Sequence, residues 1–231
     1  MKLFCIPYAG GSASIYSQWT KFFDSSIVVT PLELKGRGTR IKEGFYENFE
    51  AAVEDLYQII QNDIEENKYC LFGHSMGGIL AYELYYKIFE NQKRLPEHIF
   101  FSGTTTPSNF NKKKKVYALP DEEFLKAIIN YGGMPKEILE NKTILDFFLP
   151  ILKNDFRLIY NYQFHKKANL LQCDVSSIIG TEDTVKKENV KDFVNYTEEK
   201  CNFYEVQGNH FFIKTNKEKV IDIINAVLKN E

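Results

Sequence analysis

The sequence Gly73-His74-Ser75-Met76-Gly77 sets a serine between two glycines, at the junction of two segments with different hydrophobic patterns. Residues 69–72 form a short apolar and aromatic run suited to a buried strand, and residues 79–89 carry apolar side chains at helical spacing. A serine between such a strand and such a helix is typical of a nucleophile elbow, where a Cβ in place of either glycine would collide with backbone. A solvated serine in an ordinary loop is the alternative, and the flanking patterns favour the elbow.

Strand and helix patterns alternate through the first hundred residues. The patterns predict strands at residues 2–6, 27–30, 69–72 and 98–103, and helices at residues 14–23, 49–64 and 79–89. This alternation favours a parallel sheet, because each right-handed crossover between parallel strands needs a helix to return the chain. We therefore expect an α/β fold with a mostly parallel central sheet and helices on both faces.

The pattern changes between Pro107 and about residue 168, where no strand candidate occurs. Helical patterns are found there at residues 121–131, 136–139, 143–152 and 155–163, before strands at 174–179 and 201–206 and helices at 187–196 and 217–228 resume the alternation. The aromatic residues of this insertion either line an acyl pocket or, more commonly, pack a lid onto the core. With 231 residues, of which 44% are hydrophobic, the chain can build one large core. We expect a single domain over residues 1–231 with a helical lid insertion at about 107–168.

The composition argues against several classes of protein. A formal net charge of −2 is unlike the basic excess of nucleic-acid-binding proteins. The four cysteines are widely spaced, without a C-x-x-C or a histidine-rich tract, so neither a metal site nor a disulfide framework is indicated. The apolar stretch at residues 3–7 is too short for a signal peptide or a membrane span. We expect a cytoplasmic protein with no metal, no nucleic-acid partner and no membrane partner.

Two loops late in the chain carry the groups that a serine nucleophile needs. Gly180-Thr181-Glu182-Asp183 and Gly208-Asn209-His210 each follow a predicted strand. A serine hydroxyl needs a base to remove its proton, and an imidazole base needs a carboxylate to hold its tautomer. The order serine, acid, histidine, with the histidine after the last strand, is that of α/β-hydrolases. The candidate catalytic residues are therefore Ser75, Asp183 and His210. Glu182 is the alternative acid, and Asp183 is preferred because its shorter side chain stands one residue deeper in the turn.

Two backbone amides are candidates for stabilising an oxyanion. Met76 follows the serine at the start of a helix, where N–H groups carry partial positive charge. The glycine loop, Pro7-Tyr8-Ala9-Gly10-Gly11-Ser12, follows the first strand, and in α/β-hydrolases a loop after an early strand donates the second N–H. Ala9 is the candidate donor in this loop. A phosphate cradle is a weaker interpretation, since the loop lacks the lysine and the spacing of a P-loop.

Two basic segments leave alternatives open. Arg37 and Arg40, in the loop after the second strand, either bind an anion or tie the loop to neighbouring carboxylates, and the sequence favours neither. Lys112-Lys113-Lys114-Lys115 is either a solvated loop, which is the commoner case, or a docking patch for an acidic partner protein.

These motifs together resemble those of the stand-alone type II thioesterases that accompany nonribosomal peptide and polyketide synthetases, nearly from end to end. The likeness rests on the glycine loop, the elbow and the two late loops, and on Gly36-Arg37-Gly38-Thr39-Arg40, Gly103 with Pro107, Leu119-Pro120-Asp121 and Gly132-Gly133-Met134-Pro135. The resemblance implies hydrolysis of acyl, aminoacyl or peptidyl thioesters on the phosphopantetheine arm of carrier proteins, which clears stalled or misprimed groups. It places Ser75, Asp183 and His210 in the catalytic positions and Ala9 and Met76 in the oxyanion positions. It also implies a monomer without a cofactor of its own, since phosphopantetheine belongs to the substrate.

Two residues depart from that family's pattern. Lys35 stands where proline is frequent before Gly-Arg-Gly, and Asn209 stands where glycine is frequent before the histidine. Neither departure removes a catalytic group, although Asn209 bears on the rate because it precedes His210. Two other functions remain open: a small-ester or lipid hydrolase of the same fold, and a non-catalytic α/β-hydrolase-like binding protein. The intact serine, acid and histidine count against the second.

Overall fold

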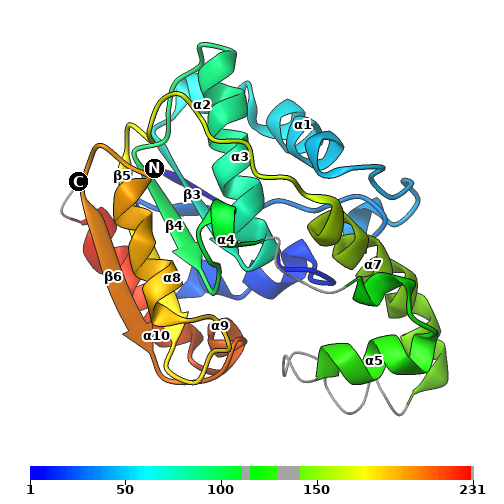
Figure 1. Ribbon diagram of the computed structural model, residues 1–231. Coiled ribbons are helices and arrows are strands. Elements are labelled where there is room, and N and C mark those ends of the chain that lie inside the picture. The colour runs from blue at the N-terminus through cyan, green and yellow to red at the C-terminus, as the bar shows by residue number, and fades with distance from the viewer. Residues whose placement is uncertain (111–114, 130–140, 230–231) are drawn as a thin grey trace.

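The computed structural model describes residues 1–110, 115–129 and 141–229, and its centre is a six-stranded sheet whose neighbouring strands all run parallel (Figure 1). The strands are β1 (Lys2–Ile6), β2 (Val28–Pro31), β3 (Tyr69–His74), β4 (His98–Ser102), β5 (Asp174–Gly180) and β6 (Cys201–Val206). Their order across the sheet is β2-β1-β3-β4-β5-β6. The predicted sheet is confirmed, and each predicted strand is present, with β3 and β5 extending slightly further.

Helices cover both faces of the sheet, because alternate residues of each strand point to opposite sides and both sides are apolar. Phe4 and Ile6 of β1 pack on one face, and Leu3 and Cys5 pack on the other. The first face is covered by α1 (Phe49–Ile60), α3 (Met76–Glu90) and part of α7 (Lys142–Asn161), and the second by the 3-10 turns η1 (Ala13–Tyr16) and η2 (Trp19–Lys21) and by α9 (Phe212–Thr215) and α10 (Lys217–Leu228). None of the helices in the described ranges is both long and apolar enough to span a membrane.

Three predicted helices are broken in the structure. Residues 14–23 form η1 and η2 instead of one helix, and hydroxyl groups compete with the helical pattern there: the Ser12 side chain caps η1, and Thr20 donates to the Ser17 carbonyl. The segment 49–64 divides into α1 and the short α2 (Asp63–Glu66), and the segment 187–196 divides into α8 (Lys187–Lys191) and the 3-10 turn η5 (Asp192–Asn195). The predicted elements are therefore in place, but with shorter regular segments.

Between β4 and β5 the regular elements of the described residues are helices, and Leu171 forms an isolated β-bridge with Thr197. The elements of the insertion are α4 (Pro107–Phe110), η4 (Val116–Ala118), α5 (Asp121–Ile129) and α7; the helix predicted at 136–139 lies outside the described residues. The separate helices predicted at 143–152 and 155–163 are one helix, α7, with Pro150 inside it. Pro150 and Asp146 are both exposed, so water can bond to the Asp146 carbonyl that loses its usual donor.

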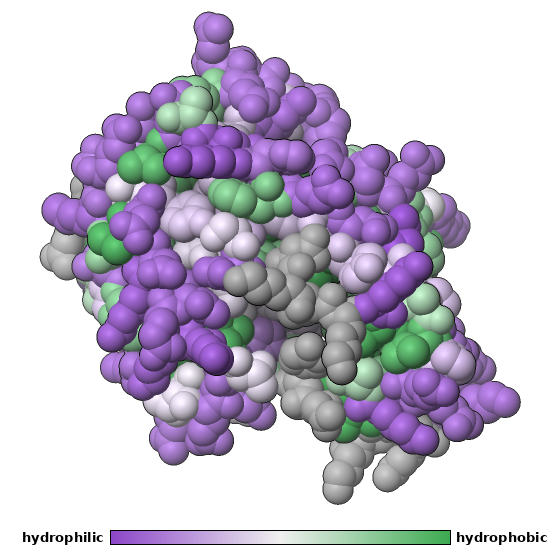
Figure 2. Space-filling model, viewed as in Figure 1, coloured by the Kyte–Doolittle hydropathy of each residue, from purple (hydrophilic) through white to green (hydrophobic). Residues whose placement is uncertain are grey.

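The insertion has a small apolar core of its own, and a few apolar side chains of its helices are exposed. Phe124 and Ile128 of α5 pack against Leu149 and Leu152 of α7. Apolar side chains also reach the surface over these helices, at the lower right of Figure 2. Among the described residues of α5 and α7, the exposed large apolar side chains are those of Ile129, Ile144 and Phe147. In Figure 1, α5 stands on the side toward which the strand arrows point.

The strand order creates a switch point between β1 and β3. The chain leaves β1 toward β2 on one side of the sheet and leaves β3 toward β4 on the other side. Loops that diverge in this way at the carboxyl ends of parallel strands leave a crevice between them, where α/β proteins place their ligands. The glycine loop follows β1 and the elbow follows β3, so the topology brings these two motifs to the same crevice.

Candidate active site

The elbow has the geometry that its glycines predict. Ser75 lies between the end of β3 and the start of α3 with φ of 55° and ψ of −116°, a conformation that non-glycine residues rarely adopt. A Cβ on Gly73 would lie 2.1 Å from the carbonyl oxygen of Gly77, and a Cβ on Gly77 would lie 2.3 Å from the carbonyl oxygen of Ile6. Both glycines are therefore required for the close approach of α3 to the sheet.

A chain of hydrogen bonds joins the serine to the predicted histidine and acid. The Ser75 hydroxyl lies 3.1 Å from His210 Nε2, and His210 Nδ1 lies 3.0 Å from each carboxylate oxygen of Asp183. The side chain of Asp183 is 0% exposed and that of His210 is 10% exposed. Water is thus largely kept from the bond between imidazole and carboxylate. The imidazole can accept a proton from the serine on one nitrogen while donating to the carboxylate from the other.

The structure separates the two candidate acids. Asp183 also accepts a hydrogen bond from the amide of Val185 at 3.0 Å, which fixes its carboxylate in the turn. Glu182 is exposed, and only its backbone amide contributes to the site, by donating to the Gly208 carbonyl at 2.9 Å. The carboxylate in contact with His210 is therefore that of Asp183, the preferred acid.

His74, inside the elbow, contacts the loop that carries His210, a contact that no sequence motif indicates. His74 Nε2 lies 2.9 Å from the carbonyl oxygen of His210, and Nδ1 lies 2.9 Å from the Ser102 hydroxyl. Because a carbonyl only accepts, Nε2 carries the proton and Nδ1 accepts from Ser102. Burial, followed by the charge of His210, lowers the pKa of His74 well below its ordinary value. A neutral His74 thus fastens the His210 loop to the ends of β3 and β4.

The two candidate oxyanion donors lie at the ends of neighbouring strands. The first turn of α3 packs directly on the start of the glycine loop, since a Cβ on Gly77 would lie 2.8 Å from the carbonyl oxygen of Pro7. Neither the amide of Ala9 nor that of Met76 donates a hydrogen bond to any described residue. Both N–H groups follow the carboxyl ends of β1 and β3, at the edge of the sheet where Ser75 stands.

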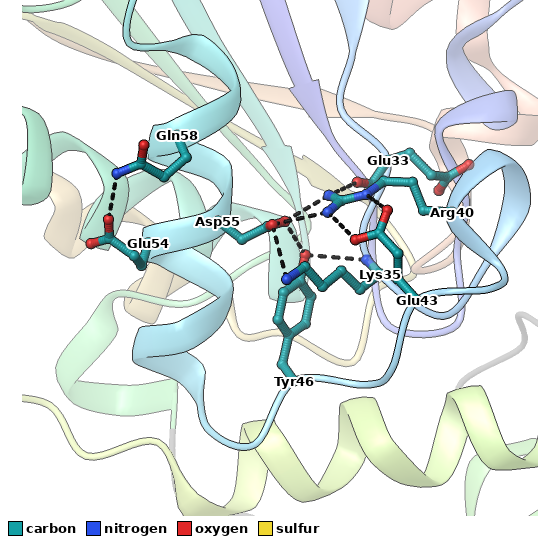
Figure 3. Close-up of polar contacts among 8 residues, drawn as sticks. All are labelled: Glu33, Lys35, Arg40, Glu43, Tyr46, Glu54, Asp55 and Gln58. Carbon is teal, nitrogen blue, oxygen red and sulfur yellow. Dashed lines mark hydrogen bonds and ion pairs between the residues drawn. The ribbon is translucent and has the colours of Figure 1, made fainter.

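Arg37 and Arg40 both tie the loop after β2 to carboxylates, which decides between the two interpretations left open above. Arg40 forms paired hydrogen bonds with Asp55 of α1, at 2.6 and 2.9 Å, and with Glu43, as Figure 3 shows. Tyr46 donates to the same Asp55 carboxylate. Arg37 pairs with Asp155 of α7.

Of the lysine run, residues 112–114 lie outside the described residues. The Lys115 ammonium group lies 5.6 Å from the ring centroid of Tyr117. Across the described part of the chain, no cluster of three or more His, Cys, Asp and Glu side chains is arranged to hold a metal ion.

The parallel sheet, the strained serine and the Ser75–His210–Asp183 hydrogen-bond chain define a protein of the α/β-hydrolase class. Comparison with protein families matches residues 1–228 to the thioesterase domain. LgrE of Brevibacillus parabrevis, named as a linear gramicidin dehydrogenase, is 32% identical over 99% of this chain and 88% of its own length. The medium-chain S-acyl fatty acid synthase thioesterase of Anas platyrhynchos is 30% identical over 99% of this chain and 92% of its own.

Comparison with solved structures supports the same family. ClbQ, from the colibactin nonribosomal peptide and polyketide pathway, is 34% identical over 99% of this chain and 97% of its own, with a TM-score of 0.95. The chain belongs to the thioesterase family and is a hydrolase. LgrE carries the name of a redox enzyme, but the groups gathered around Ser75 are those of acyl transfer.

Proposed function

We propose that this chain hydrolyses acyl, aminoacyl or peptidyl thioesters from the phosphopantetheine arm of carrier proteins, and so frees a nonribosomal peptide or polyketide synthetase of stalled or misprimed groups. The observation that carries the proposal is the Ser75–His210–Asp183 hydrogen-bond chain at the elbow. The pathway of ClbQ supports the synthetase as the setting, and the name of the Anas platyrhynchos relative supports a synthase-bound acyl group as the substrate.

In the first half of the proposed reaction, Ser75 Oγ attacks the thioester carbonyl carbon while its proton passes to His210 Nε2. Asp183 stabilises the resulting imidazolium and keeps the proton on Nδ1. The amides of Ala9 and Met76 bind the oxyanion of the tetrahedral intermediate. As the intermediate collapses, the C–S bond breaks and His210 returns its proton to the departing thiolate. The acyl group is then an ester of Ser75.

In the second half, water takes the place of the thiol. His210 accepts a proton from the water as the oxygen attacks the acyl-serine carbonyl, and the same two amides bind the oxyanion. Collapse of this intermediate breaks the ester bond and returns the proton to Ser75 Oγ, releasing a carboxylic acid. The reaction needs no cofactor from the protein, because the pantetheine arm belongs to the substrate. We also propose that the enzyme is a monomer and acts in the cytoplasm.

The test is hydrolysis of an acetylated phosphopantetheinyl carrier protein by the wild type and by Ser75→Ala, with acetyl-coenzyme A at equal concentration. We expect release from the carrier to exceed release from coenzyme A, and the substitution to lower the rate by about 10³-fold or more. Faster release from coenzyme A or simple esters, with the carrier untouched, would overturn the assignment of the substrate. Equal rates with and without the Ser75 hydroxyl would overturn the mechanism.

The Anas platyrhynchos relative points to a second candidate, release of medium-chain fatty acyl groups. An octanoylated carrier protein in the same assay distinguishes the two. Strong preference for the octanoyl group over acetyl and aminoacyl groups would favour a fatty acyl thioesterase, and similar rates on short and aminoacyl groups favour the editing role.

A further inference from the structure

Helix α7 of the insertion contacts Gly10 of the glycine loop through two of its side chains. The Gly10 amide donates a hydrogen bond of 2.7 Å to Asp155 Oδ2. Gly10 has φ of 76°, and a Cβ there would lie 2.3 Å from Leu152 Cδ2. Leu152 and Asp155 are three residues apart and so share one face of the helix. One helix face therefore fixes both the direction of the Gly10 amide and the position of its Cα.

Arg37 holds the next residue of the loop while it neutralises Asp155. Its guanidinium contacts the Asp155 carboxylate at 2.6 and 2.7 Å, and Nη1 also donates to the Gly11 carbonyl at 3.2 Å. Arg37 is 2% exposed and Asp155 is 0% exposed. Burial acts to lower the pKa of Arg37, but the charge and hydrogen bonds of Asp155 outweigh it and raise the pKa, so Arg37 keeps its positive charge. Charged, paired and out of water, these two side chains form a rigid support.

These contacts decide where the Ala9 amide points. The Gly11 amide donates to the Tyr8 carbonyl at 2.8 Å, so this carbonyl is directed into the loop. The Tyr8 carbonyl and the Ala9 N–H belong to one planar trans peptide unit and point in opposite directions. The Ala9 N–H is therefore directed out of the loop as long as Gly10 and Gly11 keep their positions.

We propose that Asp155 and Arg37 are positioning residues that hold the glycine loop so that the Ala9 amide faces the oxyanion formed at Ser75. This inference rests on the proposed function, in which Ala9 is an oxyanion donor. An oxyanion donor accelerates a reaction only when it is already in place as charge develops, and small displacements cost large factors in rate. A helix of the insertion then takes part in positioning the oxyanion donor.

The experiment compares Asp155→Asn with Asp55→Asn. Both substitutions remove the charge of a carboxylate that pairs with an arginine of the segment Gly36 to Arg40, but the hydrogen bonds of Asp55 go to Arg40 and Tyr46 and not to the glycine loop. The readouts are kcat and KM for an acyl thioester, the second-order rate of fluorophosphonate labelling of Ser75, and the melting temperature. We expect Asp155→Asn to lower kcat and the labelling rate at least about tenfold with KM nearly unchanged, and Asp55→Asn to leave both within about threefold.

Arg37→Lys keeps the positive charge but loses the paired hydrogen bonds to Asp155. It is the second variant, to be measured in case Asp155→Asn does not fold. We expect it to lower kcat and the labelling rate in the same direction by a smaller factor. A folded Asp155→Asn or Arg37→Lys that reacts as fast as Asp55→Asn, with only its melting temperature lowered, would overturn the positioning role. Wild type that is not labelled at Ser75 would instead overturn the proposed function, and the positioning role with it.

Discussion

Asp183 reaches His210 with both carboxylate oxygens, and this contact determines which imidazole nitrogen carries the proton. In Asp183→Asn the side-chain amide can turn its NH₂ group toward Nδ1, which favours the tautomer that cannot accept the serine proton. We expect kcat for an acyl thioester to fall by about 10³- to 10⁴-fold with the circular dichroism spectrum unchanged.

The matched control for this prediction is the neighbouring exposed carboxylate. Glu182→Gln removes a charge from the same turn, and we expect kcat to stay within about twofold of wild type, as for most surface substitutions. A larger loss of kcat in Glu182→Gln than in Asp183→Asn would contradict the assignment of the acid.

Site residues differ in how far the sequence reveals them. Ser75, Asp183 and His210 could be predicted because each follows a recognisable strand and the three occur in a known order. Asp155 and the contacts of His74 could not, since no motif marks the pairing of Asp155 with Arg37 or of His74 with the His210 carbonyl. A sequence pattern tells which face of an element is apolar but not which polar groups meet across the fold.

At the scale of elements, α7 is a continuous helix with a proline, Pro150, in its interior. Pro150 leaves the Asp146 carbonyl without a helical donor at an exposed site. We expect Pro150→Ala to raise the free energy of unfolding by about 1–2 kcal/mol, because the restored helix bond exceeds the entropy gained by the unfolded chain. Urea unfolding measures this change. Asp146→Ala, which alters the same turn without adding a donor, is the control, and a lower stability for Pro150→Ala would refute the explanation.

The strands could be predicted more accurately than the helices, for a physical reason. The four inner strands are short apolar runs buried on both faces and ended by a turn, as Tyr69–His74 is, whereas the edge strands β2 and β6 are partly exposed. Helix ends depend on local competition, and at residues 14–23 serine and threonine hydroxyls give the backbone other partners, so two 3-10 turns form. In the opposite direction, the two helices predicted at 143–152 and 155–163 are the single helix α7, whose Leu158 and Ile159 pack in the core.

At the scale of the whole molecule, the buried His74 makes folding depend on pH. Burial lowers its pKa in the folded protein, so the unfolded chain binds a proton at this position at a higher pH than the folded protein does. At a pH well above about 6.5, the pKa of a histidine in the unfolded chain, His74 is neutral in both states and does not make stability depend on pH. Below that pH, the free energy of unfolding falls by up to about 1.4 kcal/mol per pH unit because only the unfolded chain binds the proton. Urea unfolding at pH 7.5, 6.5 and 5.5 measures this slope.

The comparison that isolates His74 is the difference in slope between wild type and His74→Gln. Groups that do not interact with His74 are the same in both proteins, so their contributions to the slope cancel in the difference. We expect the variant to be less stable at pH 7.5 but to lose less stability between pH 6.5 and 5.5. Equal slopes in the two proteins would mean that His74 does not resist protonation in the folded state.

The attachment of α7 to Gly10 limits how this enzyme can diversify. Here Leu152 and Asp155 belong to the same helix as the exposed Phe147. A chimera in which the insertion is replaced by that of a relative must therefore contain a carboxylate that can bind Arg37 and the Gly10 amide. We expect substitutions in the N-terminal half of this helix to leave the glycine loop in place, whereas Leu152 and Asp155 in its second half can change only together with that loop.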